Sequence, residues 1–221
     1  MPNAFHPSHT PAPLVRAVGL QLRFGQQTVF TGLDFELRPG LTLVCGGESC
    51  GKTSLLRLLA GVLAPTAGVI DWLAGSSQAT QTALQRCTFW VDVRSTDLDA
   101  ISADTYWASL PGRYPTFDPQ VLAALVHELG LQVHREKPMY MLSTGSKRKV
   151  WLAGAFASRA ALTLIDEPFA ALDQRSVACV SAWLNKVAQD RKRAWVIADY
   201  AAPAPLAVQH TLALDAFGPG G

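Results

Sequence analysis

The sequence predicts an α/β fold with a mainly parallel sheet, an antiparallel β lobe near the N-terminus and an inserted helical subdomain. Three observations lead to this prediction. Short apolar runs alternate with helical segments, two longer strand-like segments come first, and the middle of the chain is rich in helix signals. The 221 residues, 49% of them hydrophobic and 16% charged, suffice for one domain with a substantial core.

The parallel sheet is predicted from short apolar runs that have the length of buried strands. Helical segments lie between most of them, an alternation that is typical of parallel sheets covered by helices. The runs are Leu41–Cys45, Cys87–Val91, Ala161–Ile165, Ala194–Ala198 and Thr211–Leu214.

The antiparallel lobe is predicted from the first part of the chain. Leu14–Phe24 and Thr28–Leu37 have strand composition and are joined around Gly25, which suits a tight turn. A second turn is expected at Arg38-Pro39-Gly40, directly before the first buried strand. This arrangement favours two adjacent antiparallel strands.

The helical subdomain is expected at about residues 95–142. Its best helix begins after Asp118, a good N-cap, with Pro119 at the first helical position. Apolar residues then recur at helical spacing up to Leu129, and Gly130 ends the helix. Because strands are expected on both sides, this subdomain is inserted into the α/β core.

The ends of the chain are expected to lie outside the folded domain, which we place at residues 14–217. Met1 to Pro13 are rich in Pro, His, Ser and Thr, which predicts a flexible extension, and residues 218–221 predict a frayed tail. The N-terminus lacks the features of a secretory signal. The most apolar stretch, Val150–Ile165, is too short to span a membrane.

Composition also argues against several classes of protein. The four cysteines, Cys45, Cys50, Cys87 and Cys179, have no paired spacing, so they predict neither a zinc site nor a disulfide framework and favour a reducing compartment. The formal net charge is only +2, so no nucleic-acid partner is expected.

The strongest motif is a glycine-rich loop between a predicted strand and a predicted helix. It matches the phosphate-loop pattern, in which backbone N–H groups and the helix N-terminus bind phosphates. Lys52 is expected to bridge the β- and γ-phosphates of a nucleotide, and Thr53 to ligate Mg²⁺. The predicted phosphate-binding segment is Gly46, Gly47, Glu48, Ser49, Cys50, Gly51, Lys52, Thr53 and Ser54. The fold prediction is thereby narrowed to a P-loop NTPase core.

Two carboxylates follow the predicted strand Ala161–Ile165. Asp166 at its end is a suitable oxygen ligand for Mg²⁺, through the water shell of the ion. Glu167 is placed to polarise an attacking water, so Glu167 and Lys52 are candidate catalytic residues.

These motifs resemble the nucleotide-binding domain of ATP-binding cassette (ABC) proteins, over about Leu14 to Leu214. Ala171-Leu172-Asp173 resembles the D-loop of that family, and Phe24 lies where the family stacks an aromatic ring on adenine, with Phe30 as a weaker rival. The segment Leu142-Ser143-Thr144-Gly145-Ser146 resembles the family signature. Ser143 suits the N-cap of a helix that begins there.

The resemblance implies an ATP-binding subunit of an ABC transporter, an ATPase that couples MgATP binding and hydrolysis to a separate membrane permease. Each ATP would lie between the phosphate loop of one cassette and the signature of a second, in a homodimer or heterodimer. The protein would then be cytoplasmic and peripheral on the inner face of the membrane. It is also similar to small exporter-type cassettes, including the haem-exporter subunit of cytochrome c maturation.

Several positions depart from the family pattern. Asp92 stands where the family has a glutamine that senses Mg²⁺, and Asp199 stands where it has a histidine that contacts the γ-phosphate. Ser49, Thr144 and Ser146 replace further family residues. Asp92 could still reach Mg²⁺ as a metal ligand, and Asp199 is a candidate catalytic residue. Because a carboxylate is repelled by a polyanion, Asp199 must point away, be protonated or bind through metal or water, which predicts weak or partner-dependent turnover. A one-residue misalignment is the alternative, although His210 is too distant to replace the histidine.

Two questions stay open from the sequence. The permease is expected to contact the region of Asp92 and about Val93–Leu110, where Tyr106 and Trp107 are either contact residues or part of the core of the lobe. The alternative functions are a regulatory or degenerate cassette with weak ATPase activity and a soluble non-transport ABC protein.

Overall fold

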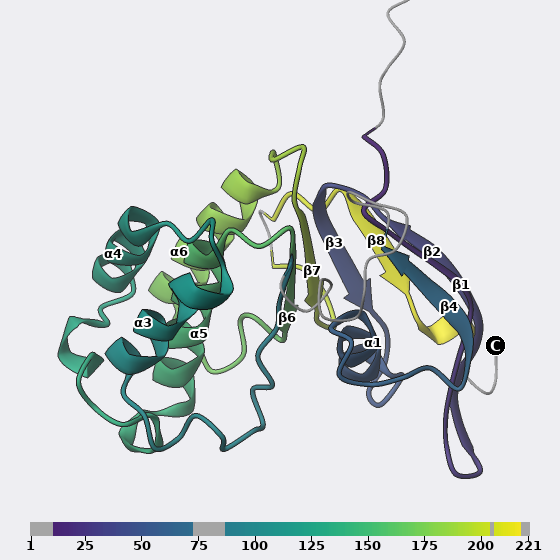
Figure 1. Ribbon diagram of the computed structural model, residues 1–221, viewed down its shortest axis with the longest axis horizontal. Coiled ribbons are helices and arrows are strands. Elements are labelled where there is room, and N and C mark those ends of the chain that lie inside the picture. The colour runs from purple at the N-terminus through teal and green to yellow at the C-terminus, as the bar shows by residue number, and fades with distance from the viewer. Residues whose placement is uncertain (1–10, 73–86, 204–205, 218–221) are drawn as a thin grey trace, which may run out of the picture.

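The computed structural model describes residues 11–72, 87–203 and 206–217, which form two sheets and a group of helices (Figure 1). The first sheet is antiparallel, in the order β2 (Gln27–Leu37), β1 (Val15–Phe24) and β4 (Ala67–Trp72). The second is parallel, in the order β5 (Thr88–Phe89), β6 (Leu162–Asp166), β7 (Ala194–Ala198), β3 (Gly40–Cys45) and β8 (His210–Ala213). The predicted fold class is confirmed.

The helices are divided between two places. Figure 1 shows α3–α6 on one side of the parallel sheet, whereas α1 lies between that sheet and the antiparallel lobe. Their bounds are α1 (Lys52–Leu59), α3 (Ala103–Arg113), α4 (Pro119–Glu128), α5 (Thr144–Ser158) and α6 (Gln174–Val187), with short 3₁₀ turns at η1 (Gln132–His134), η2 (Met139–Met141) and η3 (Asp215–Phe217).

The packing of α1 explains the layers. Its apolar side chains, with Leu55 and Leu56 fully buried, belong to a core shared with the antiparallel lobe and with one face of the parallel sheet. The other face of the sheet packs against the helical subdomain, where Trp195 of β7 stacks on Phe156 of α5 with ring centroids 4.6 Å apart. The helix that follows the phosphate loop is therefore held on both sides.

The carboxyl ends of three central strands are level with one another. Val44 of β3 and Asp166 of β6 both pair with Ala198 of β7. Loops that leave parallel strands at this edge form the usual ligand crevice of an open α/β sheet. The segments after Cys45, after Asp166 and after Ala198 therefore meet at one place, although they are far apart in the sequence.

Predicted helix starts agree with the structure. Asp118 caps α4 by accepting hydrogen bonds from the backbone N–H groups of Gln120 and Val121, and Ser143 caps α5 by accepting from the N–H of Ser146. α3 and α4 lie between β5 and β6 in the chain, so the helical insertion is present.

Other details differ from the sequence-based expectation. β4 was not anticipated, because its largely exposed residues lack the apolar run of a buried strand. Cys87–Val91 was expected to form a strand, but β5 comprises only Thr88–Phe89. Tyr106 and Trp107 are 4% and 3% exposed and belong to the core of the helical subdomain, which is the second of the two alternatives that the sequence left open.

The described residues include only part of the expected N-terminal extension and none of the expected C-terminal tail. Residues 1–10 and 218–221 lie outside the described residues, so their expected flexibility stays a prediction. Pro11 is described, and its carbonyl oxygen accepts a hydrogen bond from Arg38. Within the described residues, no helix is both long and apolar enough to cross a membrane.

Candidate functional site

The phosphate loop connects β3 to α1 in a backbone conformation that requires its glycines. Gly51 has φ +101°, and a Cβ atom there would lie 2.5 Å from Val29 Cγ1. Gly46 has φ +150°, and a Cβ there would lie 2.6 Å from Cys50 Sγ. Ser49 also has a left-handed backbone, with φ +59°, at the position where the sequence departs from the family glycine. The loop places the N-terminus of α1 toward the pocket described below.

The side chain of Lys52 folds back onto this loop. It is 8% exposed, and its Nζ donates hydrogen bonds to the carbonyl oxygens of Gly46 and Gly47 at 2.8 and 2.7 Å. The same ammonium lies 4.4 Å from the ring centroid of Tyr200. Among the described residues, no carboxylate forms an ion pair with Lys52, so its positive charge is available to an anion in the pocket.

Asp166, at the end of β6, is connected directly to the phosphate loop. The hydroxyl of Thr53 donates a hydrogen bond of 2.6 Å to Asp166 Oδ2. Asp166 is 5% exposed, and burial raises its pKa above the usual value against the opposing effects of Thr53 and of the positive charges of Arg94 and Arg148. The predicted Mg²⁺ ligands Thr53 and Asp166 are thus adjacent.

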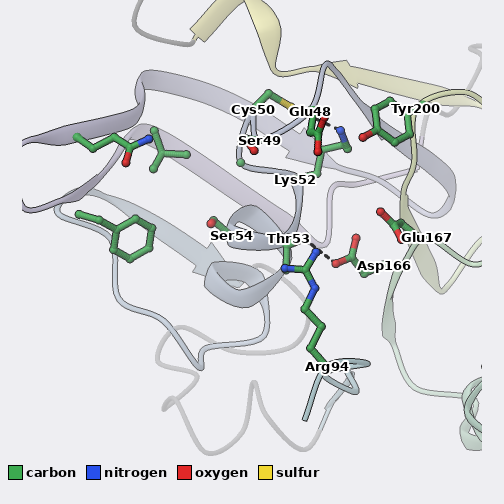
Figure 2. Close-up of a pocket in the computed structure, with 14 residues that line it drawn as sticks. Glu48, Ser49, Cys50, Lys52, Thr53, Ser54, Arg94, Asp166, Glu167 and Tyr200 are labelled. Atoms are coloured by element: carbon green, nitrogen blue, oxygen red, sulfur yellow. Dashed lines mark hydrogen bonds between the residues drawn. The ribbon is translucent and has the colours of Figure 1, made fainter. Parts of the chain in front are cut away.

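Glu167 follows in an unusual backbone conformation. Its φ is +47°, and its N–H donates a 2.8 Å hydrogen bond to the carbonyl of Ala198 in β7. The guanidinium of Arg148, from α5, donates to the carbonyl oxygens of Asp166 and Glu167. These backbone contacts hold a left-handed residue whose side chain turns into the pocket (Figure 2).

These groups line one pocket of about 330 Å³ (Figure 2). The predicted site residues that line it are Phe24, Glu48, Ser49, Cys50, Gly51, Lys52, Thr53, Ser54, Asp166 and Glu167. Phe24 is 52% exposed and offers a free ring face, whereas Phe30 is fully buried in the core. Burial therefore removes Phe30 as a candidate for stacking on a ligand.

Asp92 and Asp199 were expected at the nucleotide, where the family has its glutamine and its histidine. Neither lines this pocket. Asp92 Oδ2 pairs with Arg57 at 2.7 Å, and Asp199 Oδ1 accepts a hydrogen bond from the N–H of Tyr200. Burial raises the pKa of Asp199, and the negative charge of Glu167 adds to that rise. The side chain directly after β7 that lines the pocket belongs to Tyr200, one residue beyond Asp199. This placement supports the one-residue misalignment that the sequence left open, which stays a hypothesis.

The signature segment lies apart from the pocket. Ser143, Thr144, Gly145 and Ser146 are at the N-terminus of α5, and none of them lines it. Ser143 and Thr144 are exposed, whereas Gly145 is buried against the carbonyl of Ala171 in the D-loop segment. Within one chain, the signature and the phosphate loop therefore belong to separate surfaces.

Sequence reasoning missed several residues of the site. Gln27 and Val29 of β2 line the pocket, as do Arg94 and Tyr200, and Asp215 Oδ1 accepts a 2.8 Å hydrogen bond from the N–H of Gly47. Arg94, Tyr200 and Asp215 lie in segments without a strand or α-helix, where hydrophobic periodicity gives no signal. Tyr200 was detectable in principle, because it lies one residue beyond the position compared with the family histidine.

The close approach at Gly145 gives a stability prediction. A Cβ at Gly145 would meet the carbonyl oxygen of Ala171, so we expect Gly145→Ala to lower the free energy of unfolding by about 1–3 kcal/mol. Gly112 in α3 is the matched control, since nothing lies within 4 Å of its added Cβ. Gly112→Ala should raise stability by up to about 1 kcal/mol. Urea denaturation of both variants checks this, and equal effects would contradict it.

The fold and the site define a class of protein. A glycine-rich loop between a strand and a helix, with a buried carboxylate from another parallel strand of the same sheet bonded to its threonine, is the arrangement of phosphate-loop nucleotide-binding proteins. The inserted helical subdomain and the antiparallel lobe narrow this class further.

Comparison with known proteins identifies the family. The sequence model described as ABC transporter matches residues 30–170. The cytochrome c biogenesis ATP-binding export protein CcmA of Cupriavidus pinatubonensis is 36% identical over 182 residues, which cover 80% of each chain. The protein of the same name from Pseudomonas putida is 36% identical over 77% of this chain and 81% of its own. The chain belongs to the ABC transporter ATP-binding family.

Solved structures agree with this assignment of the fold. A putative ABC transporter ATP-binding protein from Pyrococcus furiosus superposes with a TM-score of 0.73 at 18% identity, covering 92% of this chain and 98% of the other. A bacterial Atm1-family ABC exporter with ATP bound gives a TM-score of 0.70 at 20% identity, covering 94% of this chain and 39% of the exporter. The protein is an ATP-binding subunit of an ABC transporter and belongs to a family of ATPases.

Proposed function

We propose that this protein binds MgATP between two cassettes and uses its hydrolysis to drive an export permease in cytochrome c biogenesis. The observation that carries the nucleotide part is the 2.6 Å hydrogen bond from Thr53 to Asp166, which joins the phosphate loop to the second phosphate-site strand. The export part is supported by the relatives named CcmA.

The pocket suits an adenine nucleotide along its length. Phe24 lines the pocket and offers an exposed ring for stacking on adenine, a contact that needs only a ring face. The loop residues that line the pocket, Glu48 to Ser54, would surround the phosphates with backbone N–H groups, and Lys52 would leave its loop carbonyls to bind the β- and γ-phosphates.

The residues also fit a magnesium ion. Thr53 supplies a hydroxyl and Asp166 a carboxylate, and a hard cation prefers such oxygen ligands. Burial raises the pKa of Asp166 because it disfavours the charged form, and a bound cation would favour that form. When bound, Mg²⁺ would neutralise charge on the phosphates.

Glu167 is our candidate for orienting and polarising the attacking water. Its carboxylate enters the pocket beyond Asp166, and its backbone is fixed by Arg148 and Ala198. A carboxylate held at this position accepts a proton as the water attacks.

The second cassette is inferred from the signature segment. The N-terminus of α5, capped by Ser143, does not line the pocket of its own chain, and Ser143 and Thr144 are exposed there. A helix N-terminus of this kind suits a phosphate supplied by another subunit. A second subunit, identical or related, would bring its own Ser143, Thr144, Gly145 and Ser146 to this pocket.

A groove between the helical subdomain and the end of β5 is our candidate for the permease contact. It has a volume of about 480 Å³, and its lining includes Val62, Trp90, Asp92 and Leu98. An apolar helix end of the permease on the inner face of the membrane fits this lining, so the protein would be cytoplasmic and peripheral. Co-purification of the tagged chain with a multi-span membrane protein, lost in Leu98→Asp, tests this proposal. Monomeric behaviour without any membrane partner would contradict it.

Tyr200 provides a test of the alternative function, a cassette that hydrolyses ATP only slowly. A phenol offers the terminal phosphate a neutral donor, whereas a histidine can also be cationic near pH 7. We expect Tyr200→His to raise the steady-state ATPase rate severalfold, and Tyr200→Phe to lower it. Phosphate release measured with and without the permease checks this. An unchanged rate in Tyr200→His would mean that this position does not limit turnover.

A further inference from the structure

We propose that Arg94 binds the terminal phosphate of the nucleotide, and that Asp92 positions Arg94 instead of ligating the metal. This inference rests on the proposed binding of MgATP. It concerns a residue of this chain that the sequence motifs did not indicate.

The side chain of Arg94 reaches the metal end of the pocket. Figure 2 shows its guanidinium directed toward Thr53 and Asp166, and its charge lowers the pKa of Asp166 against the larger effect of burial. Within the part of the chain that the structure describes, this guanidinium donates no hydrogen bond and forms no ion pair. It is therefore an arginine at a phosphate site with its donors unused.

The charge of the pocket requires a second cation. Among the lining residues, Glu48, Asp166 and Glu167 are acidic, whereas Lys52 and Arg94 are basic. A bound nucleoside triphosphate would add further negative charge at the end of the pocket nearest Glu167. Lys52 approaches from the loop side, and Arg94 approaches from the side of Thr53. A guanidinium binds phosphate oxygens through two parallel N–H donors, which suits the exposed terminal group.

Asp92 holds the turn that presents Arg94. Its Oδ1 accepts the backbone N–H of Arg94 at 3.0 Å, and its carbonyl accepts the N–H of Ser95 at 3.0 Å. A carboxylate that accepts a hydrogen bond two residues further on stabilises such a turn. Burial opposes ionisation, but the hydrogen bonds from Arg94 and Arg57 lower the pKa of Asp92 overall.

Arg57 connects this turn to the phosphate loop. It lies on α1, the helix that begins at Lys52, and its guanidinium pairs with Asp92 Oδ2 at 2.7 Å. Both oxygens of Asp92 are therefore engaged by protein groups, Oδ1 by the N–H of Arg94 and Oδ2 by Arg57. The turn and the phosphate-binding helix form one unit, which fixes Arg94 relative to the phosphates.

The first test compares two ligands that differ in the terminal phosphate. Binding of magnesium adenylyl imidodiphosphate and of MgADP to the purified full chain is measured by calorimetry. Arg94→Ala should weaken binding of the imidodiphosphate about tenfold and change ADP binding less than twofold, since one charge-assisted contact is lost. Arg191→Ala, in the exposed loop before β7, is the matched control and should behave as wild type.

Other outcomes of this test overturn the inference. Equal weakening of both ligands would mean that Arg94 contributes only general positive potential, and no weakening would mean that it does not touch the nucleotide. If the wild type binds neither ligand, the proposed function and this inference both fail. If Lys52→Ala loses both ligands while Arg94→Ala keeps the wild-type preference, only this inference fails.

The second test separates positioning from metal ligation at Asp92. Asp92→Asn keeps an oxygen that accepts the Arg94 N–H, so it should retain most of the preference for the imidodiphosphate. Asp92→Ala removes the acceptor and should resemble Arg94→Ala, with little further loss in the double variant. If Asp92 were a metal ligand, Asp92→Asn would raise the Mg²⁺ concentration needed for binding, and that result would overturn the positioning role.

Discussion

Replacing Lys52 by alanine is expected to weaken binding of MgATP by roughly a hundredfold or more. The ammonium is the one lining cation on the loop side of the described pocket, and it exchanges two carbonyl partners for two phosphates. Contacts with charged groups are worth about 1.5–3 kcal/mol each, so losing two of them accounts for that loss. Calorimetry with magnesium adenylyl imidodiphosphate measures it.

The fold should survive this substitution. The carbonyls of Gly46 and Gly47 that Lys52 leaves behind face an open pocket, where water can replace the ammonium. The melting temperature of Lys52→Ala should therefore stay close to that of wild type. Lys192→Ala, on the exposed loop before β7, is the control for loss of one positive charge. Wild-type affinity in Lys52→Ala would show that the nucleotide binds elsewhere.

The second large effect is expected for Glu167→Gln. An amide cannot take a proton from the attacking water, and positioned general bases contribute about 10²–10⁴-fold to the rate. We therefore expect ATP hydrolysis to fall by about that factor, while binding of MgATP changes only a few-fold. Phosphate release in the presence of the permease measures the rate.

The structure indicates that Glu167→Gln should change the chemistry of the side chain without moving it. Arg148 and Ala198 hold Glu167 through its backbone, so the glutamine should keep the same position and the same left-handed conformation. Glu136→Gln, at an exposed position in the helical subdomain, is the control for loss of one negative charge. Hydrolysis at the wild-type rate in Glu167→Gln would exclude Glu167 as the base and would favour the regulatory alternative.

Contiguous motifs were predictable because their geometry is local. Gly46 to Thr53 and the pair Asp166 and Glu167 each follow a buried strand, so hydrophobic runs and chain order placed them at one sheet edge. The caps at Asp118 and Ser143 were predictable for the same reason, because a cap depends on residues three positions apart.

Residues in irregular loops were not predictable in the same way. The position of Arg94 depends on a turn that is stabilised by Asp92, which in turn pairs with Arg57 of α1. No periodic pattern in the sequence indicates where the side chain of such a turn residue points. Comparison with the family placed Asp92 and Asp199 at the nucleotide, but their carboxylates are engaged by Arg57 and by the N–H of Tyr200.

The sequence by itself determined the class of fold, the phosphate loop and the carboxylates opposite it, because strand, loop and helix signals lie next to one another in the chain. Only the tertiary structure decided which side chains complete the pocket. At the end of β7, one residue decides whether a side chain turns toward the phosphate loop or away from it, and Tyr200 lines the pocket whereas Asp199 does not. That choice depends on the register of β7 between β3 and β6, which is a property of the assembled sheet.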